Sequence, residues 1–183
     1  MLSKLLTVCF LLLTGSCFGQ RVMLDTLTVR HVDFEGVTRQ GVIICNHQIA
    51  SDLRDIFAAL YQAKYPIECI RPISDFDNDD EQSMRANNTS CYCYRPIAGS
   101  AKLSKHAQGL AIDINPLYNP CVRRKKDGTL LVQPTTGKAY ADRSKAFKYK
   151  IRKGDLCYRL FLQHGFRWGG NWKSLKDYQH FEK

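Results

Sequence analysis

The sequence predicts a single α+β domain built from a mostly antiparallel sheet with flanking helices. Segments with strand-like alternation and segments with helical spacing follow one another irregularly, which favours this class over a regular βαβ succession. The 183 residues contain no repeat, low-complexity tract or long linker. A chain of this length can bury a substantial core as one domain.

The first segment is expected to lie outside that domain. Lys4 precedes an apolar run over residues 5–13, and residues 15–19 are rich in small side chains. This order is typical of a signal peptide, so we expect a leader over residues 1–19 and a mature domain over 20–183, exported to the periplasm or the exterior. The run is too short to cross about 30 Å of hydrocarbon, and no other segment predicts a transmembrane span. The alternative to an ordinary signal peptide is a leader that ends in lipid attachment at Cys17.

Cysteine content agrees with an exported protein. An even number of cysteines would remain after the leader is removed, and disulfides are the default expectation for such a set. The pairing stays open, although two cysteines separated by one residue on a strand point to opposite faces and are unsuited to each other. These residues are Cys45, Cys69, Cys91, Cys93, Cys121 and Cys157.

The chain is strongly basic, with a formal net charge of +10. The excess is concentrated in residues 123–126 and 143–153. Cell-wall glycan, acidic lipid and nucleic acid are the anionic partners that such a charge suits, and a solvated cationic surface is the plainer interpretation.

The N-terminal half predicts a hairpin, a helix and a loop. Residues 21–47 alternate on both sides of a turn at 34–36, and residues 66–70 suit a strand. Between them, helical spacing begins near Ser51 or Asp52 as a cap and stops before Pro66. Residues 74–90 are acidic but lack the glycine and the distal glutamate of an EF-hand, so we expect a surface loop. The helix would bury Ile49, Leu53, Ile56, Phe57 and Leu60.

The C-terminal half places polar residues on strands. Alternation over residues 110–114 buries the isoleucines and turns Asp113 toward a cleft. Residues 121–153 are basic and irregular, and a helix is expected from Asp155 to Gln163, closed by Gly165. An aromatic, glycine-rich loop over 165–172 leads into a final strand that carries His180.

Two short segments contain the inventory of a hydrolytic zinc site. Residues 104–113 supply His106 and Asp113, and a tight turn at Gly109 would let them meet at one metal. Residues 177–180 supply His180 and a further carboxylate, Asp177. Three protein ligands, a fourth position for water and a base outside the ligand set are what zinc hydrolysis requires. Each signal is weak by itself, because such short patterns also arise by chance.

Together these segments resemble a known family. The pattern Ser104-x-His106-x-x-Gly109-x-Ala111-x-Asp113, followed by Trp168-Gly169-Gly170-x-Trp172 and Asp177-x-x-His180-Phe181-Glu182, is similar to the zinc D-alanyl-D-alanine carboxypeptidases. That family includes VanY-type carboxypeptidases, D,D-dipeptidases and L-alanyl-D-glutamate endopeptidases. Residues 87–90, Tyr94-Arg95, 114–116 and 119–120 extend the resemblance over about residues 40–182. The segment Cys91-Tyr92-Cys93 departs from the pattern, and a disulfide near Arg95 would be peculiar to this chain.

The resemblance implies a fold and a set of roles. The fold would be that of the hedgehog/DD-peptidase group, and the zinc ligands would be His106, Asp113 and His180. Asp177 would be the general base, with Glu182 behind it. Arg95 would steady the oxyanion, a task suited to a guanidinium, with Arg85 as the competing assignment. Ser104, Trp168 and Tyr178 are expected to contact the substrate, and Trp172 to line the cleft.

The implied function is hydrolysis of peptide bonds in peptidoglycan stem peptides by a monomeric, exported zinc metallopeptidase. The scissile bond stays open between D-Ala-D-Ala, L-Ala-D-Glu and a cross-bridge. The alternative is a non-catalytic, zinc-containing module that binds the cell wall. A secreted nuclease would suit the charge, but no motif supports it, so no nucleic-acid partner is expected.

Overall fold

The computed structural model describes residues 22–97 and 99–183. The expected signal peptide over residues 1–19 and the lipidation alternative at Cys17 lie outside the described residues. Within the described ranges, no helix combines the length and the apolar character that a membrane span requires.

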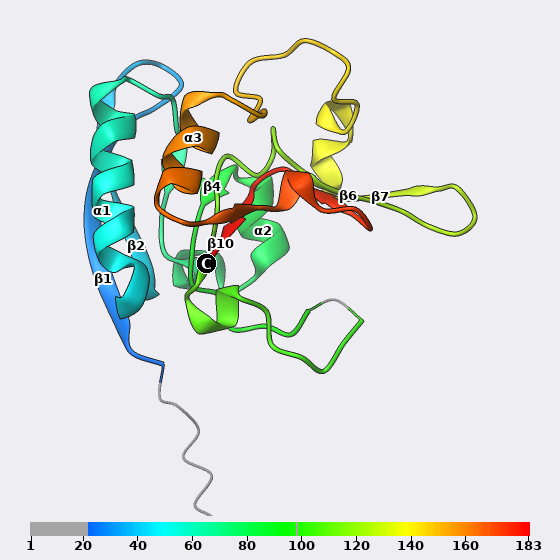
Figure 1. Cartoon of the computed structure of the whole chain (residues 1–183), viewed down its shortest axis with the longest axis horizontal. Helices are drawn as coiled ribbons and strands as arrows, with labels where there is room; N and C mark the ends of the chain where they lie inside the picture. Colours follow the sequence, from blue (N-terminus) through cyan, green and yellow to red (C-terminus); the bar gives the residue numbers. More distant parts are fainter. Residues whose placement is uncertain (1–21, 98) are drawn as a thin grey trace, which may run out of the picture.

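The chain begins with a hairpin covered by the longest helix. Strands β1 (Leu24–Val32) and β2 (Thr38–Asn46) pair antiparallel along their whole length, as the alternation predicts. Helix α1 (His47–Gln62) packs along this hairpin (Figure 1). Its cap is Asn46 rather than Ser51 or Asp52, because the helix starts directly where β2 ends and Asn46 Oδ1 accepts the Gln48 N–H at 3.0 Å.

The core lies between α1, the hairpin and helix α3 (Leu156–Gln163), which begins at the expected cap Asp155. Figure 1 shows α3 beside α1. Phe161 of α3 stacks on Phe181, with ring centroids 4.2 Å apart. Phe181 follows His180 directly, so the core fixes the strand that carries this histidine. The five apolar residues expected on α1 are all buried.

The acidic segment is more ordered than the sequence predicts. Instead of a loop, residues 74–90 contain part of the 3₁₀ helix η1 (Ile73–Phe76), the helix α2 (Asp80–Arg85) and the strand β4 (Asn88–Thr89). Asp79 caps α2 by accepting the Gln82 N–H at 3.1 Å. Strand β3 is shorter than expected, at Cys69–Ile70, and pairs parallel with β4. Acidic residues favour the N-terminus of a helix as well as loops. An acidic composition alone therefore does not distinguish the two.

Two three-stranded sheets complete the domain. The first has the order β5-β10-β8 and the second β7-β6-β9, and every pairing in them is antiparallel. Their strands are β5 (Ala111–Asp113), β6 (Cys121–Arg124), β7 (Leu130–Gln133), β8 (Arg167–Trp168), β9 (Lys176–Asp177) and β10 (His180–Glu182). Three further 3₁₀ helices are η2 (His106–Gln108), η3 (Thr135–Tyr140) and η4 (Gly169–Asn171).

The predicted α+β class with mostly antiparallel pairing is confirmed, although the pairing is divided among four small sheets.

The disulfide prediction is wrong for the described chain, where all six cysteines are free. They sit in different surroundings: Cys157 lies in the core beside Tyr65, whereas Cys121 lies beside Asp177. The expected disulfide near Arg95 is therefore also absent.

Gly109 joins the hairpin to the turn that carries His106. Its φ is +66°, and its carbonyl accepts the Asn46 N–H at 2.9 Å. A Cβ here would come within 2.6 Å of that same nitrogen. We therefore expect Gly109→Ala to lower the free energy of unfolding by at least about 2 kcal/mol, through backbone strain and this clash.

Gly128 provides the matched control, since its φ is also positive but a Cβ there would meet nothing within 4 Å. Gly128→Ala should cost only the strain of the left-handed backbone, about 1 kcal/mol. Urea unfolding of both variants measures the difference. Equal losses would show that the close approach to Asn46 is unimportant.

Candidate metal centre

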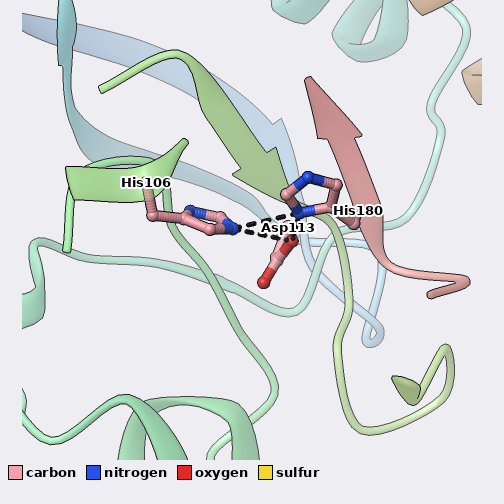
Figure 2. A group of neighbouring side chains, drawn as sticks. All are labelled: His106, Asp113 and His180. Atoms are coloured by element: carbon pink, nitrogen blue, oxygen red, sulfur yellow. Dashed lines mark hydrogen bonds and ion pairs between the residues drawn. The ribbon is translucent and has the colours of Figure 1, made fainter. Parts of the chain in front are cut away.

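Three elements bring two imidazoles and a carboxylate together. His106 comes from η2, Asp113 ends β5 and His180 begins β10. Asp113 and His180 are direct partners in the register of β5 and β10, so their side chains project from neighbouring strands. Figure 2 shows the three side chains pointing toward one another. All three residues are buried.

The facing atoms form a nearly equilateral triangle. His106 Nε2 lies 3.1 Å from His180 Nδ1 and 3.3 Å from Asp113 Oδ1. His180 Nδ1 lies 3.1 Å from the same Asp113 oxygen. A tetrahedral zinc with bonds of about 2.0–2.1 Å separates its ligand atoms by about 3.3 Å. The triangle is therefore the size of one face of a zinc tetrahedron, and the donor set fits this metal.

In each imidazole, the ring nitrogen that faces away from the triangle also has a partner. His106 Nδ1 lies 2.7 Å from the Cys91 carbonyl, which can only accept, so the ring donates there and directs Nε2 inward. His180 Nε2 lies 3.4 Å from Glu182 Oε2, and Arg167 binds the other oxygen of that carboxylate at 2.7 Å. Such outer contacts fix ring orientation and tautomer in metal sites. The expected position of Glu182 behind the site agrees with this contact.

The electrostatics of the triangle favour a cation at its centre. Burial disfavours the charged form of Asp113, but the adjacent His106 and His180 outweigh burial and lower its pKa. Burial lowers the pKa of His180, but hydrogen bonds with Asp113 and Glu182 outweigh it and raise the pKa to about 10. The ionised Asp113 thus stabilises positive charge where the three side chains meet, and a metal ion bound there would displace the proton of His180.

Asp177 lies beside this triangle on β9, paired in register with Cys121. Its Oδ1 is buried and has no hydrogen-bond partner within the described residues. Burial raises its pKa to about 6, with His180 opposing the rise. A Cβ on Gly169 would come within 2.8 Å of the Asp177 Cβ and 3.2 Å of the His180 Cβ. The glycine therefore lets η4 approach both residues closely.

Of the two arginines considered, Arg95 is the one that interacts electrostatically with Asp113 and Asp177 of the site. Its Nε lies 2.7 Å from Asp80 Oδ2. Burial lowers its pKa, but Asp80, Asp113, Cys93 and Asp177 outweigh burial and raise it. Arg85 instead pairs with Glu81 at 3.1 Å on the surface and donates to Thr135.

The three residues expected to contact the substrate each have a contact within the protein. Ser104 Oγ accepts the Ala107 N–H at 3.2 Å and so stabilises the turn before η2. Trp168 is only 6% exposed, and its indole donates to the Tyr178 carbonyl. The Tyr178 ring packs 4.3 Å from the Arg143 guanidinium. Trp172 lies closer to the triangle, with its ring centroid 5.1 Å from that of His180. Substrate contact by Ser104, Trp168 and Tyr178 stays a prediction.

Four neighbours of the site were not identified from the sequence. They are the Asn46 side chain, which donates to Gln108 O at 2.9 Å, together with the Cys91 carbonyl, Cys121 and Asp80. A backbone carbonyl has no sequence signature. Asp80 lies in an acidic stretch whose composition indicated only a loop.

Comparison with known proteins agrees with this geometry. Residues 98–183 match the family model described as D-alanyl-D-alanine carboxypeptidase. No match was found among curated proteins or among solved structures. The matched segment contains the whole triangle and Asp177, and the match supports a peptidase. This match over the C-terminal segment supports the resemblance to the D-alanyl-D-alanine carboxypeptidases.

Proposed function

We propose that the protein is an exported zinc metallopeptidase that hydrolyses peptide bonds in peptidoglycan stem peptides. His106, Asp113 and His180 would hold the metal, and the observation that carries the proposal is their triangle of facing atoms with edges of 3.1–3.3 Å. The family match over residues 98–183 supports the peptidase class and the substrate class. The proposed signal peptide accounts for delivery to the wall.

The chain's own residues divide the chemistry among them. Bound zinc would polarise the scissile carbonyl and acidify a water molecule. Asp177 would take the proton of that water and pass it to the leaving amine, a task that its raised pKa and its buried, unpartnered oxygen suit. The Arg95 guanidinium would stabilise the negative charge that develops on the carbonyl oxygen.

A non-catalytic wall-binding module with structural zinc is the rival function. Asp177 argues against it, because a structural site closes its coordination shell and has no use for a buried carboxylate outside the ligand set. The Arg95 charge beside the same site points the same way.

Chelation separates the two functions. We expect a strong zinc chelator to abolish cleavage of purified muropeptides, and added zinc to restore it, while the products seen by mass spectrometry identify the bond that is cut. A wall-binding module would produce no cleavage before chelation. Cleavage that survives complete removal of zinc would contradict the metallopeptidase.

A further inference from the structure

The contact between Asp80 and Arg95 joins a short helix to the edge of the candidate site. Asp80 Oδ2 and Arg95 Nε are 2.7 Å apart, and their side chains are 20% and 33% exposed. The contact is an ion pair rather than an aligned hydrogen bond, since Arg95 Nε has no partner that meets the directional requirement. Within residues 22–97 and 99–183, no oxygen accepts a hydrogen bond from the two terminal nitrogens of Arg95.

Apart from Asp80, few contacts fix the position of the Arg95 side chain. It follows a stretch over residues 91–95 that forms no helix or strand, and the next pairing along the chain is a single bridge between Pro96 and Leu103. The Arg95 carbonyl accepts the Ser104 N–H at 3.1 Å, which fixes the backbone but not the guanidinium. The Cys93 thiol lies near this guanidinium, because Arg95 opposes the rise that burial produces in the pKa of Cys93.

Asp80, in contrast, stands on a well-anchored element. It is the first residue of α2, directly after the cap Asp79. Ser83 and Met84 of this helix are buried; Ser83 Oγ accepts from Asn88 and Met84 Sδ lies 3.4 Å from Gln179 Nε2. Gln179 immediately precedes His180. The helix that carries Asp80 is therefore tied to the strand that carries a proposed metal ligand.

We propose that Asp80 is a positioning residue that holds the Arg95 guanidinium at the site, with its terminal nitrogens free for the carbonyl oxygen of the substrate. The carboxylate oxygen lies 2.7 Å from Nε and holds the guanidinium by charge, while the fork of the terminal nitrogens can bind an oxyanion. This inference rests on the proposed peptidase function. A displacement of about 1 Å can remove much of the effect of a group that must meet the transition state.

The kinetic test uses Asp80→Asn, which keeps the shape of the side chain and removes its charge. We expect kcat for muropeptide cleavage to fall about 10- to 100-fold, with KM changed less than about two-fold and zinc stoichiometry unchanged. Asp80→Glu should recover part of the loss. In an Arg95→Ala background, Asp80→Asn should lower kcat by less than about two-fold further, since the two residues act as one unit.

Asp75→Asn is the matched control, because Asp75 forms a similar 2.9 Å pair with Arg71 on the surface. It should leave kcat within about two-fold of wild type, as expected for an exposed pair. Wild-type kcat in Asp80→Asn, or an undiminished loss in the Arg95→Ala background, would overturn the positioning role.

A second measurement needs no turnover. The ¹⁵N relaxation of the Arg95 Nε–H reports whether the guanidinium is ordered, and we expect order parameters typical of a rigid group in wild type and below about 0.6 in Asp80→Asn. An Nε–H that is equally ordered in both would overturn the inference. If wild type cleaves no muropeptide, the proposed function fails, and the relaxation result still decides whether Asp80 orders Arg95.

Discussion

Asp177→Ala is expected to retain zinc and lose hydrolysis. The side chain lies outside the triangle of His106, Asp113 and His180, so its removal should leave metal stoichiometry near that of wild type. Removal of a general base lowers kcat by about 10²–10⁴-fold, and we expect a loss in this range because alanine has no group that could accept the proton. Muropeptide turnover and metal analysis of the same preparation measure both effects.

The control is Asp127→Ala, whose carboxylate binds Thr129 in the exposed turn between β6 and β7. It should preserve both zinc and turnover. Full activity in Asp177→Ala would remove Asp177 from the base role and leave Glu182 as the candidate to examine next.

His180→Ala is expected to lose both zinc and hydrolysis. His180 Nδ1 forms two of the three edges of the triangle, each 3.1 Å long. Removal of an outer-shell partner already weakens metal binding by 10- to 100-fold, so loss of a ligand should cost more than about 100-fold in zinc affinity. Competition with a chromogenic chelator measures that affinity directly, independently of catalysis.

His164→Ala provides the comparison, because His164, at the end of α3, binds Asp52 of α1 at 3.1 Å and is not a proposed ligand. It should leave zinc affinity unchanged. If His180→Ala bound zinc as tightly as His164→Ala does, the ligand set proposed for this centre would be wrong.

Much of the scaffold can be predicted from local patterns. The hairpin over residues 21–47, the apolar face of α1 and the cap at Asp155 follow from alternation, helical spacing and side-chain capping. The tight turn at Gly109 also follows from the glycine, and the structure gives it a left-handed φ of +66°. The meeting of His106, Asp113 and His180 rested on the family resemblance, since the pattern by itself was weak.

Features that depend on distant contacts were missed. The Asn46 cap is favoured because its side chain binds both α1 and the turn of Gln108, which lies 62 residues away along the chain. The role of Asp80 depends in the same way on Arg95, and α2 is stabilised by Asp79 and by packing rather than by a long apolar pattern. Disulfides were expected from cysteine number, but number does not bring thiols together, and six free thiols were found instead.

The most direct test of the central proposal is zinc-edge X-ray absorption, with anomalous diffraction, on the purified protein loaded with zinc. We expect one zinc per chain, bound by His106 Nε2, Asp113 Oδ1 and His180 Nδ1 at about 2.0–2.2 Å, with a fourth ligand that does not come from the protein. A zinc held elsewhere, or one whose fourth position is filled by a protein side chain, would contradict an open hydrolytic centre.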